Sequence, residues 1–258
     1  GGIVAAFMGP EIAVRASAMI PATNYMGSFL AMAILYGLTA VVLLFYKGQG
    51  GPSLVVDSGG RALGEVASQP DYRLAVFSAA VSYGVMTFVM TATPVHLTNA
   101  HGFDLVTTSN VIKSHIAAMY IPSLFTGSLI DRFGLQRVMT SGVLILLVSA
   151  GFGVGASSLP FYYAALILLG VGWNFLFVGA TVLLTKTYSS SERFRAQALN
   201  DFIIFGVQAT ASLSAGAVLQ LVSWDAVNLL GVGLLVLALV LLIRGKSILT
   251  VSHALTWN

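Results

Sequence analysis

Four ionisable residues stand inside long apolar stretches of the sequence: Glu11, Lys113, His115 and Asp201. Glu11 precedes Arg15 by four residues, and we expect these two to form a local ion pair near the external surface. Burying such groups away from water is costly unless each is paired, hydrogen-bonded or able to change its protonation state. The residue types point to two kinds of chemistry, an ion pair between an acid and a base, or the uptake and release of a proton. We hold two interpretations at equal weight: a Lys–Asp or His–Asp pair that locks two helices together, and a direct role in handling a substrate or protons.

Asp201 is the sharpest candidate, because polar residues continue from it along one helical face. It follows Arg193 by eight residues, which is about 12 Å along a helix. Gln208 lies seven residues further on, on the same face, with Asn200 beside Asp201. Counted from residue 105 at the opposite end, Lys113 is also about 12 Å deep. We therefore expect Asp201 and Lys113 near the middle of their segments.

Lys113 and His115 are two positions apart, about 200° around a helix, so they cannot face the same cavity. Lys113 shares its face with Asn110, and we expect it to line the cavity. We expect His115 to form an interhelical hydrogen bond, and as a titratable group it is also a candidate for coupling to protons.

An aromatic ring beside an amide, Trp173 and Asn174, lies near the middle of another apolar segment. This pair suits an organic substrate with a flat or amphipathic part, but a buried Trp whose N–H is satisfied by a neighbour is an equal alternative. Tyr83 begins a second polar stripe that continues through Thr87 and Thr91 at every fourth residue.

The composition excludes a soluble protein. Of the 258 residues, 57% are hydrophobic and only 8% are charged, whereas a soluble domain carries roughly a quarter charged residues. The basic residues lie in separate short loops rather than on one face, which argues against nucleic-acid binding. The sequence has no cysteine and no nucleotide-binding or catalytic motif, so we expect no cofactor, no metal and no enzymatic activity.

The apolar segments predict an all-α integral membrane protein with about eight transmembrane helices. The eight segments cover approximately residues 1–15, 23–46, 73–97, 106–130, 137–157, 160–187, 193–222 and 225–244. All but the first are long enough to cross about 30 Å of hydrocarbon at 1.5 Å per residue. Within the third segment we expect Pro94 to break or kink the helix near His96.

The basic residues predict the orientation in the membrane. Ten of the twelve lysines and arginines fall in one alternate set of connections, and the opposite set has only Arg15 at its edge. The positive-inside rule therefore places the long polar linker and the C-terminus in the cytoplasm. The ten residues are Lys47, Arg61, Arg73, Arg132, Arg137, Lys186, Arg193, Arg195, Arg244 and Lys246.

A short charged turn, GSLIDRFGLQR from Gly127 to Arg137, joins two of the long apolar segments. Its pattern G-x-x-x-D-R-x-G, built on Gly127, Asp131, Arg132 and Gly134 and followed by the basic Arg137, resembles the signature turn of the major facilitator superfamily of secondary transporters. The sequence departs from that signature after Gly134, where the family has two basic residues and this chain has Leu and Gln.

The resemblance implies a helical bundle of the major facilitator type that contains helices five to twelve of that fold. It divides the chain into the last two helices of an N-terminal bundle (1–46), a cytoplasmic linker (47–72), a C-terminal six-helix bundle (73–246) and a cytoplasmic tail (247–258). The turn from Gly127 to Arg137 would then form a cytoplasmic gate contact. The chain opens inside an apolar segment, so we expect further N-terminal helices of the same protein as its partner.

The function implied by the resemblance is secondary transport of a small organic solute by alternating access, with proton coupling as a further expectation. The resemblance places the protein in the inner (plasma) membrane and leaves symport and antiport, and import and export, open. Two alternatives remain: a sensor of the same fold that binds a ligand without transporting it, and an integral-membrane enzyme, for which the expected cluster of polar catalytic groups at one interface is missing from the sequence.

Overall fold

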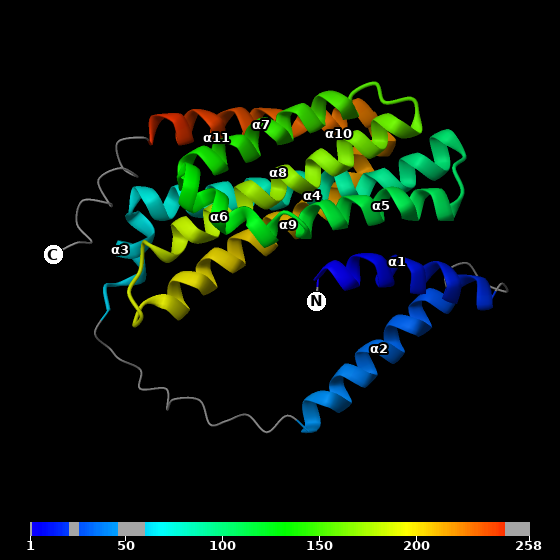
Figure 1. Cartoon of the computed structure of the whole chain (residues 1–258), viewed down its shortest axis with the longest axis horizontal. Helices are drawn as coiled ribbons and strands as arrows, with labels where there is room; N and C mark the ends of the chain where they lie inside the picture. Colours follow the sequence, from blue (N-terminus) through cyan, green and yellow to red (C-terminus); the bar gives the residue numbers. More distant parts are fainter. Residues whose placement is uncertain (1, 21–25, 46–59, 246–258) are drawn as a thin grey trace.

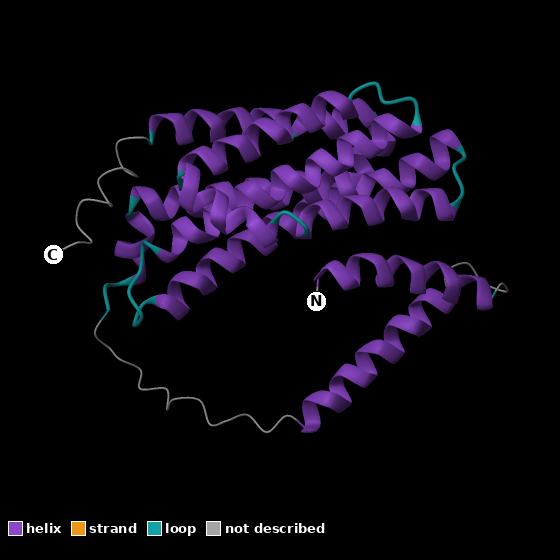
Figure 2. Cartoon of the chain, viewed as in Figure 1, coloured by secondary structure: helices purple, strands orange, loops and turns teal. Residues whose placement is uncertain are grey.

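The computed structural model describes residues 2–20, 26–45 and 60–245, and every regular element within these ranges is a helix (Figures 1 and 2). The helices are α1 (Gly2–Met19), α2 (Met26–Phe45), α3 (Leu63–Ser68), α4 (Pro70–His101), α5 (Leu105–Tyr120), α6 (Ser123–Phe133), α7 (Leu135–Gly153), α8 (Leu159–Thr185), α9 (Arg193–Leu221), α10 (Trp224–Leu230) and α11 (Val232–Arg244). This confirms the prediction of an all-α membrane protein.

Six helical stretches in the described part of the chain are long and apolar enough to cross a membrane: α2, α4, α7, α8, α9, and α10 together with α11. The predicted span over 106–130 is instead divided into α5 and α6. Pro122 causes the interruption, because proline has no N–H to donate to the carbonyl of the preceding turn. At Pro94 the helix does not break, since α4 continues through it to His101; of the two predicted outcomes, a break or a kink, the break is wrong.

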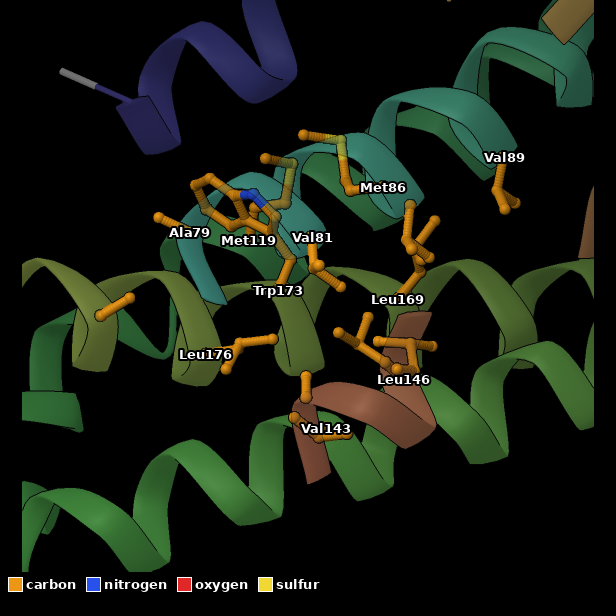
Figure 3. Packing of buried hydrophobic residues seen from close by; sticks show 14 of the residues in the cluster. Ala79, Val81, Met86, Val89, Met119, Val143, Leu146, Leu169, Trp173 and Leu176 are labelled. Atoms are coloured by element: carbon orange, nitrogen blue, oxygen red, sulfur yellow. The ribbon is translucent and has the colours of Figure 1, made fainter. Parts of the chain in front are cut away.

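Helix α8 is the centre of the main bundle and packs against α4, α5 and α7. Small residues permit this close packing, as is typical of membrane helices. A Cβ atom added at Gly142 of α7 would lie 2.6 Å from the backbone N of Leu176 in α8. One added at Gly170 of α8 would lie 2.6 Å from the carbonyl O of His115 in α5. The core between these helices is apolar, with Val143, Leu146, Leu169 and Leu176 in one layer (Figure 3).

Helices α1 and α2 form a hairpin that touches the main bundle through contacts between α1 and α5 (Figure 1). Apart from Gly27, the side chains of α2 are exposed or only partly covered within this chain, and most are large and apolar. A helix that is apolar all round is expected in lipid or against other membrane helices.

The predicted linker 47–72 is partly helical. Residues 46–59 lie outside the described part, but α3 and the start of α4 fall within the range predicted as linker. Arg61, just before α3, binds Glu192 in the α8–α9 connection through two side-chain contacts, Nε–Oε1 at 2.9 Å and Nη2–Oε2 at 2.8 Å. The Arg61 guanidinium and the Ser189 N–H both donate to this carboxylate and hold the pKa of Glu192 well below its usual range. This ion pair therefore attaches the end of the linker to the N-terminal end of α9.

The signature turn is a direct junction between two helices. Helix α6 ends at Phe133, Gly134 adopts a φ of +89°, and α7 begins at Leu135. A positive φ favours glycine, because it has no Cβ to clash with the backbone. Asp131, Arg132 and Arg137 are exposed, and the Arg132 guanidinium lies 5.3 Å from the ring centre of Phe133.

Candidate functional site

Three aromatic rings from α4 and α8 form a cluster in the middle of the bundle. The ring of Tyr83 meets Trp173 edge-to-face, with centroids 5.2 Å apart, and meets Phe177 in the same way at 4.8 Å. Trp173 and Phe177 are stacked at 5.0 Å. Phe177 follows Trp173 by four residues, so both rings project from the same face of α8. We call Tyr83, Trp173 and Phe177 the aromatic cluster.

The aromatic cluster combines apolar rings with unused hydrogen-bonding groups. Figure 3 shows the Trp173 indole pointing away from the Leu176 layer, toward Met119 and Met86. Its Nε1 is buried and has no hydrogen-bond partner in the part of the chain that the structure describes, and the same holds for the buried hydroxyl of Thr87 on α4. Tyr83 and Phe177 are only partly buried. Offset and edge-on ring surfaces with a free N–H suit a flat, polar heterocycle.

Asn174, predicted beside Trp173 as a substrate ligand, serves a different purpose in this structure. It is 1% exposed, and its Nδ2 donates to the Met119 carbonyl of α5 at 2.7 Å. The Thr126 hydroxyl of α6 donates to its Oδ1 at 2.6 Å. The amide therefore spans the break at Pro122 and satisfies a carbonyl near the end of α5, where intrahelical donors run out.

Lys113 forms an ion pair with an acid other than the expected Asp201. Its Nζ lies 2.6 Å from Oε2 of Glu11 in α1, while Oε1 of the same carboxylate accepts a hydrogen bond from Arg15 Nε at 2.7 Å. Lys113 is mostly covered, with 16% of its side chain exposed, whereas Arg15 is 74% exposed. Of the two cations, Lys113 therefore makes the more shielded contact, and this contact joins α1 to α5.

His115 is fully buried between α5 and α8, as its placement opposite Lys113 suggests. Its Nδ1 lies 2.8 Å from the Leu166 carbonyl of α8 and donates to it in the tautomer protonated at this atom. The other ring nitrogen, Nε2, is buried and has no hydrogen-bond partner within residues 2–20, 26–45 and 60–245. His115 therefore links α5 to α8 through a hydrogen bond in this conformation.

Asp201 does not pair with Lys113 or His115, so the predicted ion pair is wrong for this conformation. Asp201 is exposed on α9 and accepts a hydrogen bond from Nδ2 of the neighbouring Asn200 at 3.0 Å. Within the described ranges, no cation lies within ion-pairing distance of it. Asn200 itself is buried, and Gln208, about two helical turns beyond Asp201 on α9, is partly buried.

The structure therefore brings together some predicted site residues and separates others. Tyr83 meets Trp173 across α4 and α8, whereas Lys113 and Asp201 have different surroundings. Phe177 was missed, although its i+4 spacing from Trp173 was a signal available in the sequence. The acid that neutralises Lys113 was also missed, because Glu11 had been assigned only to Arg15 four residues away.

Comparison with known proteins agrees with this architecture. The family model of the Major Facilitator Superfamily matches residues 74–251. The chain is 40% identical over 247 residues to the riboflavin transporter RfnT of Brucella anthropi. This alignment covers 94% of the present chain and 61% of the relative. It is 38% identical over 167 residues to the uncharacterized MFS-type transporter YdeG of Bacillus subtilis. That alignment covers 63% of the present chain and 38% of the relative. No solved structure matches the chain.

The chain belongs to the Major Facilitator Superfamily, which confirms the resemblance drawn from the turn at Gly127 to Arg137. With its spanning helices, it is a multi-pass membrane protein. The chain spans about three-fifths of the length of the riboflavin transporter and less of the Bacillus relative.

Proposed function

We propose that this chain is part of a secondary transporter that carries a small organic solute across the membrane by alternating access. The family and the transporter names of its relatives support this, and they also support the expectation that it is not an enzyme. Binding by a non-transporting sensor is the competing activity, and flux in reconstituted vesicles separates the two.

The solute we propose is a flat heterocycle of the riboflavin kind, and the aromatic cluster is the observation that carries this proposal. Tyr83 and Phe177 offer ring surfaces, and the Trp173 Nε1–H is a buried donor with no partner among the described residues. An orphaned donor beside stacked rings favours a ligand that supplies both a π-face and an acceptor. The relative from Brucella anthropi is named as a riboflavin transporter, which agrees with this chemistry.

The test is riboflavin binding and uptake by the full-length protein, with ribitol as a non-aromatic comparison. An aromatic contact contributes about 0.5–1.5 kcal/mol beyond burial, so Trp173→Leu should raise the Kd for riboflavin by about two- to tenfold. Trp173→Phe keeps a ring and should have the smaller effect. Trp224→Phe is a matched control, because Trp224 lies outside the cluster and donates to the Gly153 carbonyl. Equal affinity in Trp173→Leu and the wild type, or no riboflavin uptake at all, would refute the proposal.

Proton coupling is proposed for Asp201, with Lys113 and His115 as the other candidates. A carboxylate at membrane depth that has no cationic partner in the described part of the chain is expensive when charged, so it favours a role in which it binds a proton. Replacing Asp201 by Asn and measuring uptake with and without a pH gradient tests this role. Unchanged dependence on the gradient would exclude Asp201 from coupling.

We further propose that Glu11 and Lys113 join the two bundles in one transport state and separate in the other. The assignment of α1 to the N-terminal bundle and α5 to the C-terminal bundle follows the predicted division of the chain. On the opposite side, Asp131, Arg132 and Arg137 at the junction with Gly134 would form the cytoplasmic gate contact. The inner membrane and a cytoplasmic C-terminus belong to the same proposal, supported by the distribution of basic residues.

A further inference from the structure

A long apolar groove runs along α4. It has a volume of about 760 Å³, and its walls come from α4, α9, α10 and α11. Nearly all of its lining is apolar, including Phe77, Val89 and Leu234. None of the aromatic-cluster residues line it, so the groove is distinct from the solute site proposed above.

The dimensions of the groove match those of a lipid tail. Along α4 its lining extends from Tyr72 to Val89, a rise of seventeen residues or about 26 Å of helix. Since α4 is a spanning helix, the groove lies parallel to the acyl chains of the surrounding bilayer. At Gly206 of α9, a lining residue, an added Cβ would meet no atom within 4 Å, so the groove has open space at this depth.

A single cation, Arg73, stands at one end of the groove. It is exposed, and its Nε donates to the Ala67 carbonyl at 3.1 Å, which leaves its terminal nitrogens without a hydrogen bond to the described part of the protein. No carboxylate within the described ranges forms an ion pair with it. Arg73 lies at the start of α4, the end that the positive-inside rule places at the cytoplasmic surface. An arginine next to an apolar groove complements a lipid phosphate in charge and geometry.

We propose that this groove binds an anionic phospholipid, with one acyl chain along α4 and α9 and the headgroup phosphate at Arg73. The apolar walls exclude a water-soluble polar ligand, and the unpaired guanidinium selects a headgroup with net negative charge over a zwitterionic one. The bound lipid fills the open space that the described parts of α4, α9, α10 and α11 leave between them.

The experiment is native mass spectrometry of the purified full-length protein with phosphatidylglycerol or phosphatidylcholine of the same chain length. The wild type should retain phosphatidylglycerol preferentially, and Arg73→Ala should reduce that preference by about fivefold, the effect of one basic residue at a membrane surface. Arg73→Lys keeps the charge and should keep the preference. Lys186→Ala removes an exposed cation at the end of α8, which does not line the groove, and should leave the lipid preference unchanged.

A second pair of variants tests the acyl chain. Gly206→Leu fills the groove and should lower retention of both lipids, whereas Gly216→Leu on the same helix adds a side chain where there is open space outside the groove. An unchanged preference in Arg73→Ala would overturn the proposal. So would equal retention in the two glycine variants, or stabilisation by glycerol phosphate, a headgroup without chains, equal to that by phosphatidylglycerol. If Gly206→Leu does not fold, Arg73→Ala alone decides.

Discussion

The bond between Thr126 and Asn174 should be measurable as a coupling free energy across the break in the fourth predicted span. The Thr126 hydroxyl of α6 lies 2.6 Å from the Asn174 Oδ1 of α8, and both residues are fully or almost fully buried. We expect Thr126→Val and Asn174→Leu, which roughly preserve volume, to destabilise the protein non-additively. The bond from Asn174 to the Met119 carbonyl is lost equally in the single and double variants, so it cancels in the cycle.

The magnitude follows from the setting of this bond. Interhelical hydrogen bonds in membrane proteins contribute about 0.6 kcal/mol on average and up to about 1.7 kcal/mol in double-mutant cycles. The Thr126 hydroxyl has a second acceptor, the Pro122 carbonyl at 2.8 Å, to which it can donate when Asn174 is replaced. This alternative recovers part of the loss, so we expect a coupling of about 0.5–1 kcal/mol, toward the lower end of that range.

The assay is SDS-induced unfolding of the full-length protein, of both single variants and of the double variant. A control cycle combines Thr126→Val with Thr181→Val instead of Asn174→Leu. Thr181 is also on α8, but its hydroxyl donates to the Phe177 carbonyl of the same helix rather than to α6. This control pair should be additive within about 0.5 kcal/mol. If the Thr126–Asn174 pair were as additive as the control, the bridge across the Pro122 break would contribute nothing and the reasoning would fail.

Two further predictions concern stability. Because Arg61 holds the pKa of Glu192 below its usual value of about 4.3, this pair stabilises the protein above that pH and its contribution is lost as the pH falls further. The thermal midpoint of Glu192→Gln should therefore be lower than that of the wild type at pH 7 by at least about 2 °C, with the gap closing toward pH 3; a constant gap would contradict this. Gly142→Ala should lower the midpoint, because its new methyl group would meet the Leu176 backbone at 2.6 Å, whereas Gly151→Ala, where no atom lies within 4 Å, should not.

The membrane architecture was largely predictable because its signals are one-dimensional. Hydropathy identifies a spanning helix such as α2 or α8 without reference to any neighbour, since lipid forces each segment to satisfy its own backbone. The turn from Gly127 to Arg137 was likewise visible as a local pattern, and its family assignment is confirmed. The division of the span at Pro122 was missed, and proline gave no reliable signal, because α4 passes through Pro94 without ending.

The sequence by itself determined which segments lie in the membrane and which ionisable groups stand within them. It also determined which residues share a helical face, as Trp173 does with Phe177. Tertiary structure alone decided their partners. Lys113 pairs with Glu11, 102 residues away, rather than with Asp201, and the Asn174 amide turns to Met119 rather than to a solute. The reason is physical: depth in the bilayer is fixed by position along one helix, but a hydrogen bond requires two helices to bring their side chains within about 3 Å.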